Sequence, residues 1–202
     1  MPQSVVTLDF EDLGTTTRLT LTHAGLPDKE DAADHSRGWT SAVEKFGQWI
    51  EMREGSGPLV LERVFDAPVA LVWQALTEKE KIAQWSFVMT DFKPEVGFEF
   101  EFWGQKDDVK YHHRCKVTEA IPHKKLAYTW RYVGFPGDSL VTWELFEEGN
   151  KTRVRLTHTG IETFPATEDY ARKNFFAGWT AIVGTTLKEF VEKAAAGAPV
   201  HR

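Results

Sequence analysis

The stretch VTWELFEEGNKTRVRLTHTGI, from Val141 to Ile161, contributes most to the expected fold. Apolar and polar residues alternate on both sides of Gly149-Asn150, a dipeptide typical of a two-residue turn, so the stretch predicts a β-hairpin. Alternation with period two gives each strand one buried face and one solvated face. The face expected to be buried carries Val141, Trp143, Leu145, Val154, Leu156 and His158.

A long helix is expected after this hairpin, from about residue 167 to residue 195. Apolar residues recur there at helical spacing, and they are expected to cover the dry face of the sheet. They are Phe175, Phe176, Trp179, Ile182, Val183, Leu187 and Phe190.

Three more strands are expected before the hairpin, in VGFEFEFWG (96–104), KYHHRCKVTEAI (110–121) and KKLAYTWRY (124–132). Further upstream, GPLVLERVFDAP (57–68) predicts a strand that ends in a turn, with Pro68 at the first helical position. Two short helices are expected next, because Thr77 and Glu80 have the spacing of a capping box. This order predicts an α+β protein in which a curved antiparallel sheet grips one long C-terminal helix.

Several of these stretches resemble a known family. The segments ERVFDAPVALVWQALTEKEKIAQW, FEFEFWG, LTHTG and GWT are similar to the activator of 90-kDa heat-shock-protein ATPase homologue family, in the SRPBCC or START-like superfamily. The resemblance covers about residues 57–195. It implies a helix-grip fold, in which a seven-stranded antiparallel sheet is wrapped around the C-terminal helix.

Part of this pattern occurs a second time, at the start of the chain. VTLDFEDLGTTTRLTLTHAGL, from Val6 to Leu26, aligns without a gap with the first stretch over 21 residues, nine of them identical, and GWT recurs at Gly38 and Gly178. Residues 1–52 are therefore expected to be a partial repeat, with two strands joined at Gly14 and a helix over 31–51. Residues 53–58 are expected to be a linker, residues 59–196 the complete domain, and residues 197–202 a polar tail.

The partial repeat lacks the strands and short helices that would complete its core, so it is expected to need a partner surface. Its strands are expected either to extend an edge of the complete domain or to form a homodimer with a second chain. Residues 1–135 also contain every element of one domain in permuted order. A further alternative is a remnant of a truncated tandem gene or a mistaken start site.

Composition excludes several classes of function. A net charge of −6 argues against a nucleic-acid surface, and the single cysteine, Cys115, excludes an internal disulfide and a cysteine-based zinc site. No apolar run is long enough for a membrane span and no signal peptide is evident, so a cytoplasmic location is expected. Cys115 is interpreted as a core residue, and no metal or cofactor is expected.

The remaining candidate for function is a cavity between the sheet and the long helix. Its expected wall is Phe98, Phe100, Tyr111, His113, Tyr128, Trp130, Trp143, Phe176 and Trp179. Such a wall suits a small hydrophobic or aromatic ligand, and a closed aromatic core is the alternative. The resemblance also implies a chaperone partner, although nothing here resembles the additional N-terminal domain on which that role depends. A third hypothesis is a polyketide-cyclase-like enzyme with His113 or Tyr128 as acid or base.

Two other histidine positions are interpreted from the strand pattern alone. His112 is expected on the solvated face, opposite to His113, so these two rings are not expected to chelate one metal. His158 and its repeat His23 are interpreted as packing residues.

Overall fold

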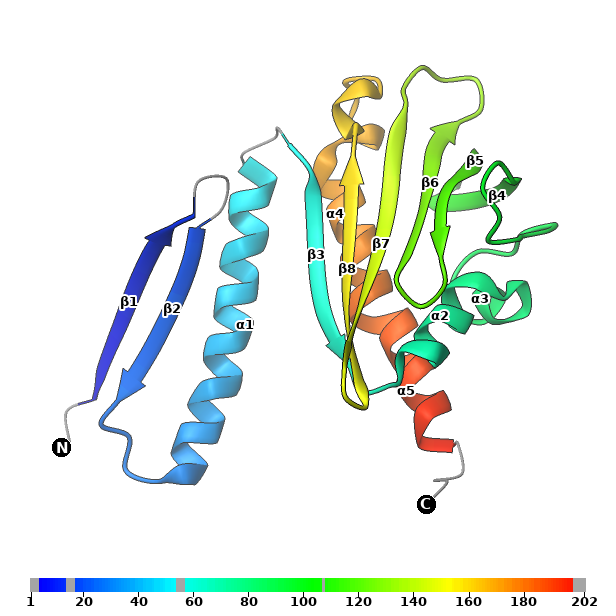
Figure 1. The fold of residues 1–202 in the computed structure, drawn as a ribbon. Coiled ribbons are helices and arrows are strands. Elements are labelled where there is room, and N and C mark those ends of the chain that lie inside the picture. The colour runs from blue at the N-terminus through cyan, green and yellow to red at the C-terminus, as the bar shows by residue number, and fades with distance from the viewer. Residues whose placement is uncertain (1–3, 14–16, 54–56, 107, 198–202) are drawn as a thin grey trace. The chain divides into compact units, whose positions relative to one another are not determined.

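The computed structural model describes residues 4–13, 17–53, 57–106 and 108–197. The chain divides into two compact units, residues 1–50 and 51–202 (Figure 1). The expected turn at Gly14, most of the expected linker and the tail beyond residue 197 lie outside the described residues. Within the described part of the chain, no helix has the length and apolar character needed to cross a membrane.

The second unit is built on a six-stranded antiparallel sheet with the strand order β3-β8-β7-β6-β5-β4 (Figure 1). Gly149, at φ +66°, and Asn150 form the expected two-residue turn, which pairs Glu148 with Lys151. The strands are β3 (Leu59–Phe65), β4 (Glu99–Lys106), β5 (Val109–Ile121), β6 (Lys125–Tyr132), β7 (Ser139–Glu148) and β8 (Lys151–Thr159).

The family resemblance implied seven strands, and this number is wrong for the described residues. The segment between the short helices and β4 forms no described strand: it meets the sheet in an isolated bridge between Met89 and Phe102 and in backbone hydrogen bonds of Gly97 and Phe98 with Val117. Pro94 has no N–H to donate to a ladder, and Gly97 has a positive φ of 93°. The segment therefore packs its aromatic side chains on the inner face of β4 as irregular chain.

Two short helices follow β3, as expected, but the expected capping box is absent. They are α2 (Val69–Thr77) and α3 (Lys79–Trp85), separated by Glu78 in an extended conformation. Pro68 is the N-cap of α2, whereas it was expected to be the first residue of the helix. Thr77 is the last residue of α2, and its hydroxyl donates to the carbonyl of Trp73 at 2.7 Å instead of capping α3.

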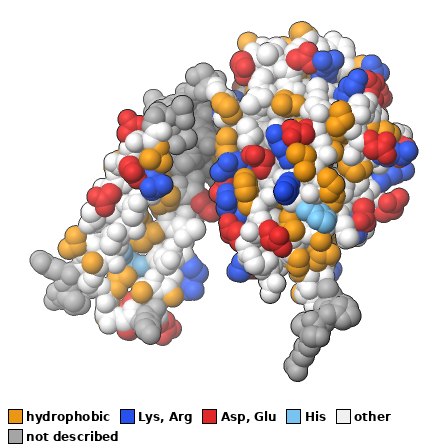
Figure 2. Space-filling model, viewed as in Figure 1, with side chains coloured by type: hydrophobic (Ala, Val, Ile, Leu, Met, Phe, Trp, Pro, Cys, Tyr) orange, Lys and Arg blue, Asp and Glu red, His pale blue; other side chains and the backbone are white. Residues whose placement is uncertain are grey.

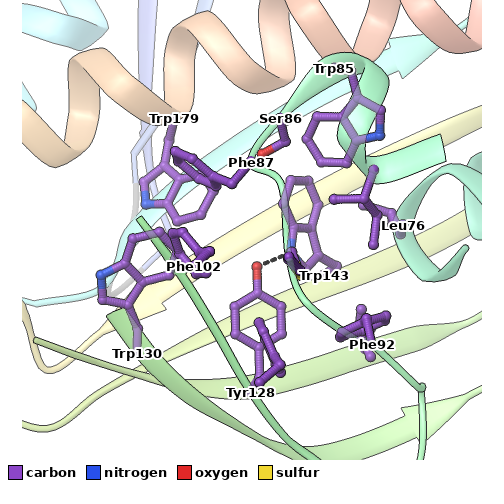
Figure 3. A pocket seen from close by; sticks show the side chains of 14 residues that line it. Leu76, Trp85, Ser86, Phe87, Phe92, Phe102, Tyr128, Trp130, Trp143 and Trp179 are labelled. Carbon is purple, nitrogen blue, oxygen red and sulfur yellow. Dashed lines mark hydrogen bonds between the residues drawn. The ribbon is translucent and has the colours of Figure 1, made fainter. Parts of the chain in front are cut away.

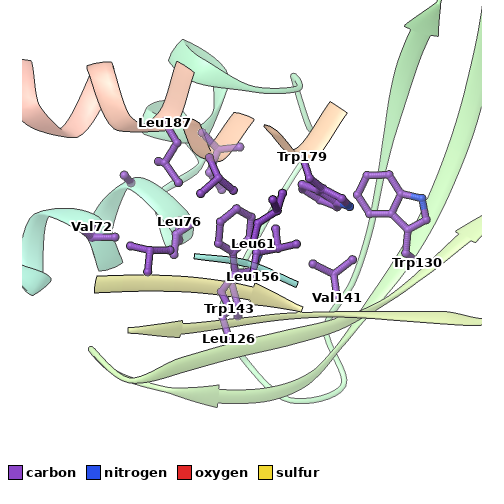
Figure 4. Packing of buried hydrophobic residues seen from close by; sticks show 14 of the residues in the cluster. Leu61, Val72, Leu76, Leu126, Trp130, Val141, Trp143, Leu156, Trp179 and Leu187 are labelled. Carbon is purple, nitrogen blue, oxygen red and sulfur yellow. The ribbon is translucent and has the colours of Figure 1, made fainter. Parts of the chain in front are cut away.

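The long C-terminal helix begins later than expected, after short 3-10 turns at Ile161–Thr163 and Glu168–Tyr170. It comprises α4 (Arg172–Ala181), a π-helical turn at Ile182–Thr186 and α5 (Leu187–Gly197). It lies across the inner face of the sheet, and its apolar face packs with the strands into one core (Figure 4). The inner faces expected for the hairpin are buried in full.

The first unit contains a hairpin and one helix: β1 (Val5–Asp12), β2 (Thr17–Ala24) and α1 (Lys29–Arg53). Asp28 caps the helix, because its Oδ1 accepts from the backbone N–H groups of Glu30 and Asp31, both at 2.9 Å. The indole Nε1 of Trp39 in α1 donates to Nδ1 of His23 in β2 at 3.1 Å. The helix is thereby attached to β2.

Candidate functional site

A small cavity lies in the second unit, between the inner face of the sheet, the α2–α3 region and α4 (Figure 3). Its volume is about 30 Å³, which is enough for roughly one water molecule. Aromatic side chains make up most of its wall. The lining residues are Leu76, Ile82, Trp85, Ser86, Phe87, Met89, Phe92, Phe100, Phe102, Leu126, Tyr128, Trp130, Trp143 and Trp179.

Five of the nine residues expected in the wall line this cavity, and four do not. Those that line it are Phe100, Tyr128, Trp130, Trp143 and Trp179. Phe98 is half-buried at the margin of the core, and Phe176 is buried elsewhere along α4. Tyr111 lies away from the cavity, with its ring centroid 6.0 Å from that of Tyr132 and 6.3 Å from that of Tyr170.

His113 is buried one layer behind the cavity wall. Its ring stacks on Phe102 with a centroid distance of 4.5 Å and lies 4.7 Å from the ring of Trp130. Gly104 makes room for it, because a Cβ at that position would stand 3.0 Å from Cε1 of the histidine. His113 therefore supports two wall residues and does not line the cavity.

The pattern of the sequence did not indicate the part of the wall that follows α3. Trp85, Phe87, Met89 and Phe92 come from WSFVMTDF, a stretch with neither helical nor strand periodicity. The signal present was its richness in large apolar residues. Phe102 alternates in phase with the expected wall residues Phe98 and Phe100, and it stacks on Phe87 with 4.4 Å between the ring centroids.

A second cavity of about 140 Å³ lies beside the first, against α4. Phe87, Trp130 and Trp179 line both cavities. The outer cavity is completed by Asp169, Asn174, Phe175, Gly178 and Ile182. The ring of Phe87 is thus part of the partition between an inner and an outer space.

Three of the four tryptophans in the inner wall have a hydrogen-bond acceptor for the indole N–H. Trp143 donates to the hydroxyl of Tyr128 at 3.1 Å (Figure 3), Trp179 to Nδ1 of His158 at 3.0 Å, and Trp85 to the carbonyl of Ala75 at 3.0 Å. Trp130 is the exception among these four: its buried Nε1 has no hydrogen-bond partner among the described residues, as is also true of His113 Nδ1 and Thr180 Oγ1. An unsatisfied buried donor costs about 1–3 kcal/mol.

The Tyr132 hydroxyl is the neighbouring group that interacts with the Trp130 indole, although the two do not meet the geometry of a hydrogen bond. Tyr132 is a polar neighbour, and burial raises the pKa of its hydroxyl to about 12, an increase that the Trp130 indole partly opposes. The carbonyl of Trp130 is already used, since it accepts from the Ser139 hydroxyl at 2.9 Å.

His158 is fully buried, and both of its ring nitrogens form hydrogen bonds within the core. Because Nδ1 accepts from Trp179, the proton resides on Nε2, which donates to the Ser139 hydroxyl at 2.8 Å. Burial lowers the pKa of this histidine to about 3, with a smaller contribution from Arg172. The interpretation of His158 as a packing residue agrees with these contacts.

The titratable groups near the cavity are neutral at ordinary pH. Burial lowers the pKa of His113 to about 4 and raises the pKa of both Tyr128 and Cys115. Across the described ranges, no three His, Cys, Asp or Glu side chains are grouped so that they could hold a metal ion. The inner cavity is therefore an uncharged aromatic space with the Tyr128 hydroxyl in its wall, whereas the side chain of Asp169 belongs to the lining of the outer cavity.

His112 lies on the opposite face of β5 and is partly buried there. Its ring stacks on Trp103 with a centroid distance of 4.3 Å, and its Nε2 lies 2.9 Å from Oε2 of Glu101. Arg114 and then His112 lower the pKa of that carboxyl group. The two neighbouring histidines are therefore on opposite faces, as the alternation predicted.

Comparison with known proteins gives one family and many similar folds. The sequence matches the family described as "Activator of Hsp90 ATPase homolog 1-like protein" over residues 1–51 and 66–192. No curated protein matches the chain.

Small bacterial proteins of known structure resemble about two thirds of the chain. Protein MLL2253 of Mesorhizobium loti is 25% identical, with a TM-score of 0.54, over 68% of this chain and 98% of that protein. Protein BH1534 of Bacillus halodurans is 27% identical, with a TM-score of 0.55, and the same shares of the two chains are covered. Protein CV1439 of Chromobacterium violaceum has the same fold, with 24% identity and a TM-score of 0.57 over 67% of this chain and 96% of that one. The chain therefore belongs to the activator of Hsp90 ATPase homolog 1-like family and has its α+β helix-grip fold.

Proposed function

We propose that the second unit binds a small hydrophobic molecule that carries at least one hydrogen-bond acceptor. The observation that carries the proposal is the Tyr128 hydroxyl, which belongs to the aromatic wall of the inner cavity and accepts from the Trp143 indole at 3.1 Å (Figure 3). An acceptor on the ligand would receive the proton of this hydroxyl, while the aromatic walls would bury an apolar body.

The inner cavity is too small for such a ligand, so binding requires a side chain to move. Typical ligand pockets enclose about 300–1,000 Å³, well above the inner volume of about 30 Å³. Phe87 is the best candidate, because it is half-buried, comes from irregular chain and lines both cavities. Rotation of its ring would join the two spaces without a change in the sheet.

Neutral walls favour binding over acid–base catalysis. With the pKa of His113 lowered to about 4 and that of Tyr128 raised, neither group exchanges protons readily near neutral pH. The Tyr128 hydroxyl accepts from Trp143, which leaves its own proton as a donor for the ligand.

Titration with the fluorescent probe 1-anilinonaphthalene-8-sulfonate tests this proposal. We expect saturable binding to the wild-type protein and an affinity at least several-fold higher for Phe87→Ala, because the smaller side chain joins the cavities. Tyr128→Phe keeps the aromatic wall and removes the hydroxyl, so it is expected to weaken binding roughly 5- to 30-fold, the equivalent of about 1–2 kcal/mol.

Trp103→Phe is the matched control, because Trp103 is a largely exposed tryptophan on the outer face of β4. It should leave the affinity for the probe unchanged. The absence of saturation, or equal losses in Trp103→Phe and Tyr128→Phe, would exclude the cavity as the binding site.

A further inference from the structure

The apolar face of β1 in the first unit is uncovered. Val6, Leu8 and Phe10 lie on one face of the strand and are exposed by 39%, 50% and 62%. Their positions in the repeated stretch correspond to Val141, Trp143 and Leu145 of β7, whose exposed fractions are 0%, 2% and 5%. The same set of positions thus forms core in one unit and surface in the other.

The local structure of the first unit is nevertheless that of its repeat. The Trp39–His23 hydrogen bond of 3.1 Å corresponds to the Trp179–His158 bond of 3.0 Å. Both bonds join the second strand of a hairpin to the helix that follows it. The hairpin and helix therefore have their native arrangement, and the exposure of β1 reflects missing neighbours.

The second unit shows which neighbours are missing. There β7 is paired on one side with β8 and on the other with β6. In the first unit the sheet has two strands, and the edge of β1 away from β2 carries no described strand. In addition, hydrophobic side chains are visible on the surface of this unit (Figure 2). An open edge next to an apolar face is a template for strand pairing.

We propose that a second copy of this chain covers this face, through antiparallel pairing of β1 with β1. The product would be a four-stranded sheet with the order β2-β1-β1-β2 and the two α1 helices on one face. Such a contact is isologous and closes on itself as a dimer, which a head-to-tail contact does not do.

The sequence of β1 is complementary to itself in one register. When Leu8 lies opposite Leu8, Val6 of each copy lies opposite Phe10 of the other, so all three apolar residues pair with apolar residues. On the other face Asp9 then lies opposite Thr7. A register centred on Asp9 would place two carboxylates opposite each other, which is unfavourable. A register centred between two residues would place the apolar face of one β1 on the same side as the polar face of the other. The two α1 helices would then lie on opposite faces of the sheet.

The dimensions of the two layers also agree. Four strands at a spacing of about 4.8 Å are as wide as two helices packed about 10 Å apart. Each α1 already packs on its own β2 through the bond between Trp39 and His23. The uncovered strip over the two central strands is where the two helices would meet.

Cysteine cross-linking of the full chain tests the register. Residues directly opposite each other in an antiparallel pair have Cβ atoms about 4.5–5.5 Å apart, close enough for a disulfide after small adjustment. Leu8→Cys is expected to form a covalent dimer on mild oxidation. Val6→Cys and Phe10→Cys should each form little covalent dimer when oxidised alone. A mixture of the two variants should form the cross-link, because residue 6 of one copy lies opposite residue 10 of the other. Val64→Cys, at an exposed apolar position of the edge strand β3, is the control that should not cross-link, and the native Cys115 is buried.

The mass in solution, measured by light scattering, provides an independent test. We expect a dimer for the wild-type chain, a monomer for Leu8→Lys, and a dimer for Thr7→Lys, whose side chain lies on the other face of β1. A monomeric wild-type chain without the Leu8→Cys cross-link would overturn the proposal and indicate that the face is covered within one chain or not at all. A dimer that persists in Leu8→Lys would also overturn it, because another surface would then hold the copies together.

Discussion

One histidine–tryptophan hydrogen bond occurs in both units, and the two copies show what burial does to it. His158 is fully buried and uses both nitrogens, whereas His23 is half-buried and has a described bond only at Nδ1. The bond itself fixes the helix to the strand in either setting. Burial in the core of the second unit lowers the pKa of His158 to about 3.

Burial of this neutral histidine makes stability depend on pH. The unfolded chain gains a proton at His158 as the pH falls below about 6.5, and the native chain does not until about pH 3, so stability is lost between these values. His113, with a pKa of about 4, adds to the loss in the same direction. We expect a decrease of roughly 1.5 kcal/mol per histidine between pH 6.5 and pH 5.

Urea titrations at a series of pH values measure this effect. His158→Gln is expected to be less stable at pH 7, because the packing is disturbed, but to lose less stability on acidification than the wild type. Parallel curves for the two proteins below pH 6.5 would contradict the assignment.

Among the elements, the regular strands were predictable and the chain between α3 and β4 was not. Apolar and polar residues alternate along β7 and β8 in step with the buried and exposed side chains, so the hairpin and its inner face could be predicted from the sequence. Phe87 and Met89 belong to no period, and their positions are set by contacts with Phe102. The cavity wall was therefore predicted on the sheet side and missed on the opposite side.

The π-helical turn in the C-terminal helix also has a cause in the sequence. Trp179, Val183, Leu187 and Val191 are all buried at intervals of four residues. Each residue of a regular α-helix turns by about 100°, so an interval of four residues exceeds a full turn by about 40°. The buried positions would therefore move steadily around the helix. A π turn accommodates one extra residue and brings them back to one face. In the repeat, Trp39, Val43, Phe46 and Ile50 have intervals of four, three and four, and α1 is continuous.

Deletion of Gly184 tests this explanation. It changes the intervals after Trp179 to four, three and four, so the helix should become regular and the free energy of unfolding should change by no more than about 1 kcal/mol. Deletion of Ala177, before Trp179, is the control, and it should cost more than about 3 kcal/mol because Phe175 and Phe176 rotate out of the core. Equal losses for the two deletions in urea titrations would show that the π turn is required in its own right.

At the scale of the whole molecule, burial is distributed unequally between the units. No described side chain of residues 4–50 is fully buried, whereas the second unit has a continuous aromatic and aliphatic core. A hairpin with one helix and no closed core is marginal in water. Its stability is therefore expected to come from whatever covers β1, while the second unit supports itself.

Hydrogen exchange in the intact chain, followed by mass spectrometry at two protein concentrations, tests this difference. Peptides from β1, β2 and α1 should exchange faster than peptides from β5 to β8, because less surface is lost from water around them. If a second copy covers β1, tenfold dilution should speed exchange in the first unit about threefold, since the monomer fraction of a mostly dimeric sample varies with the inverse square root of concentration. Exchange in the second unit should not change on dilution, which makes it the internal control. Equal protection in both units, or exchange in β1 that is independent of concentration, would contradict a hairpin stabilised by association.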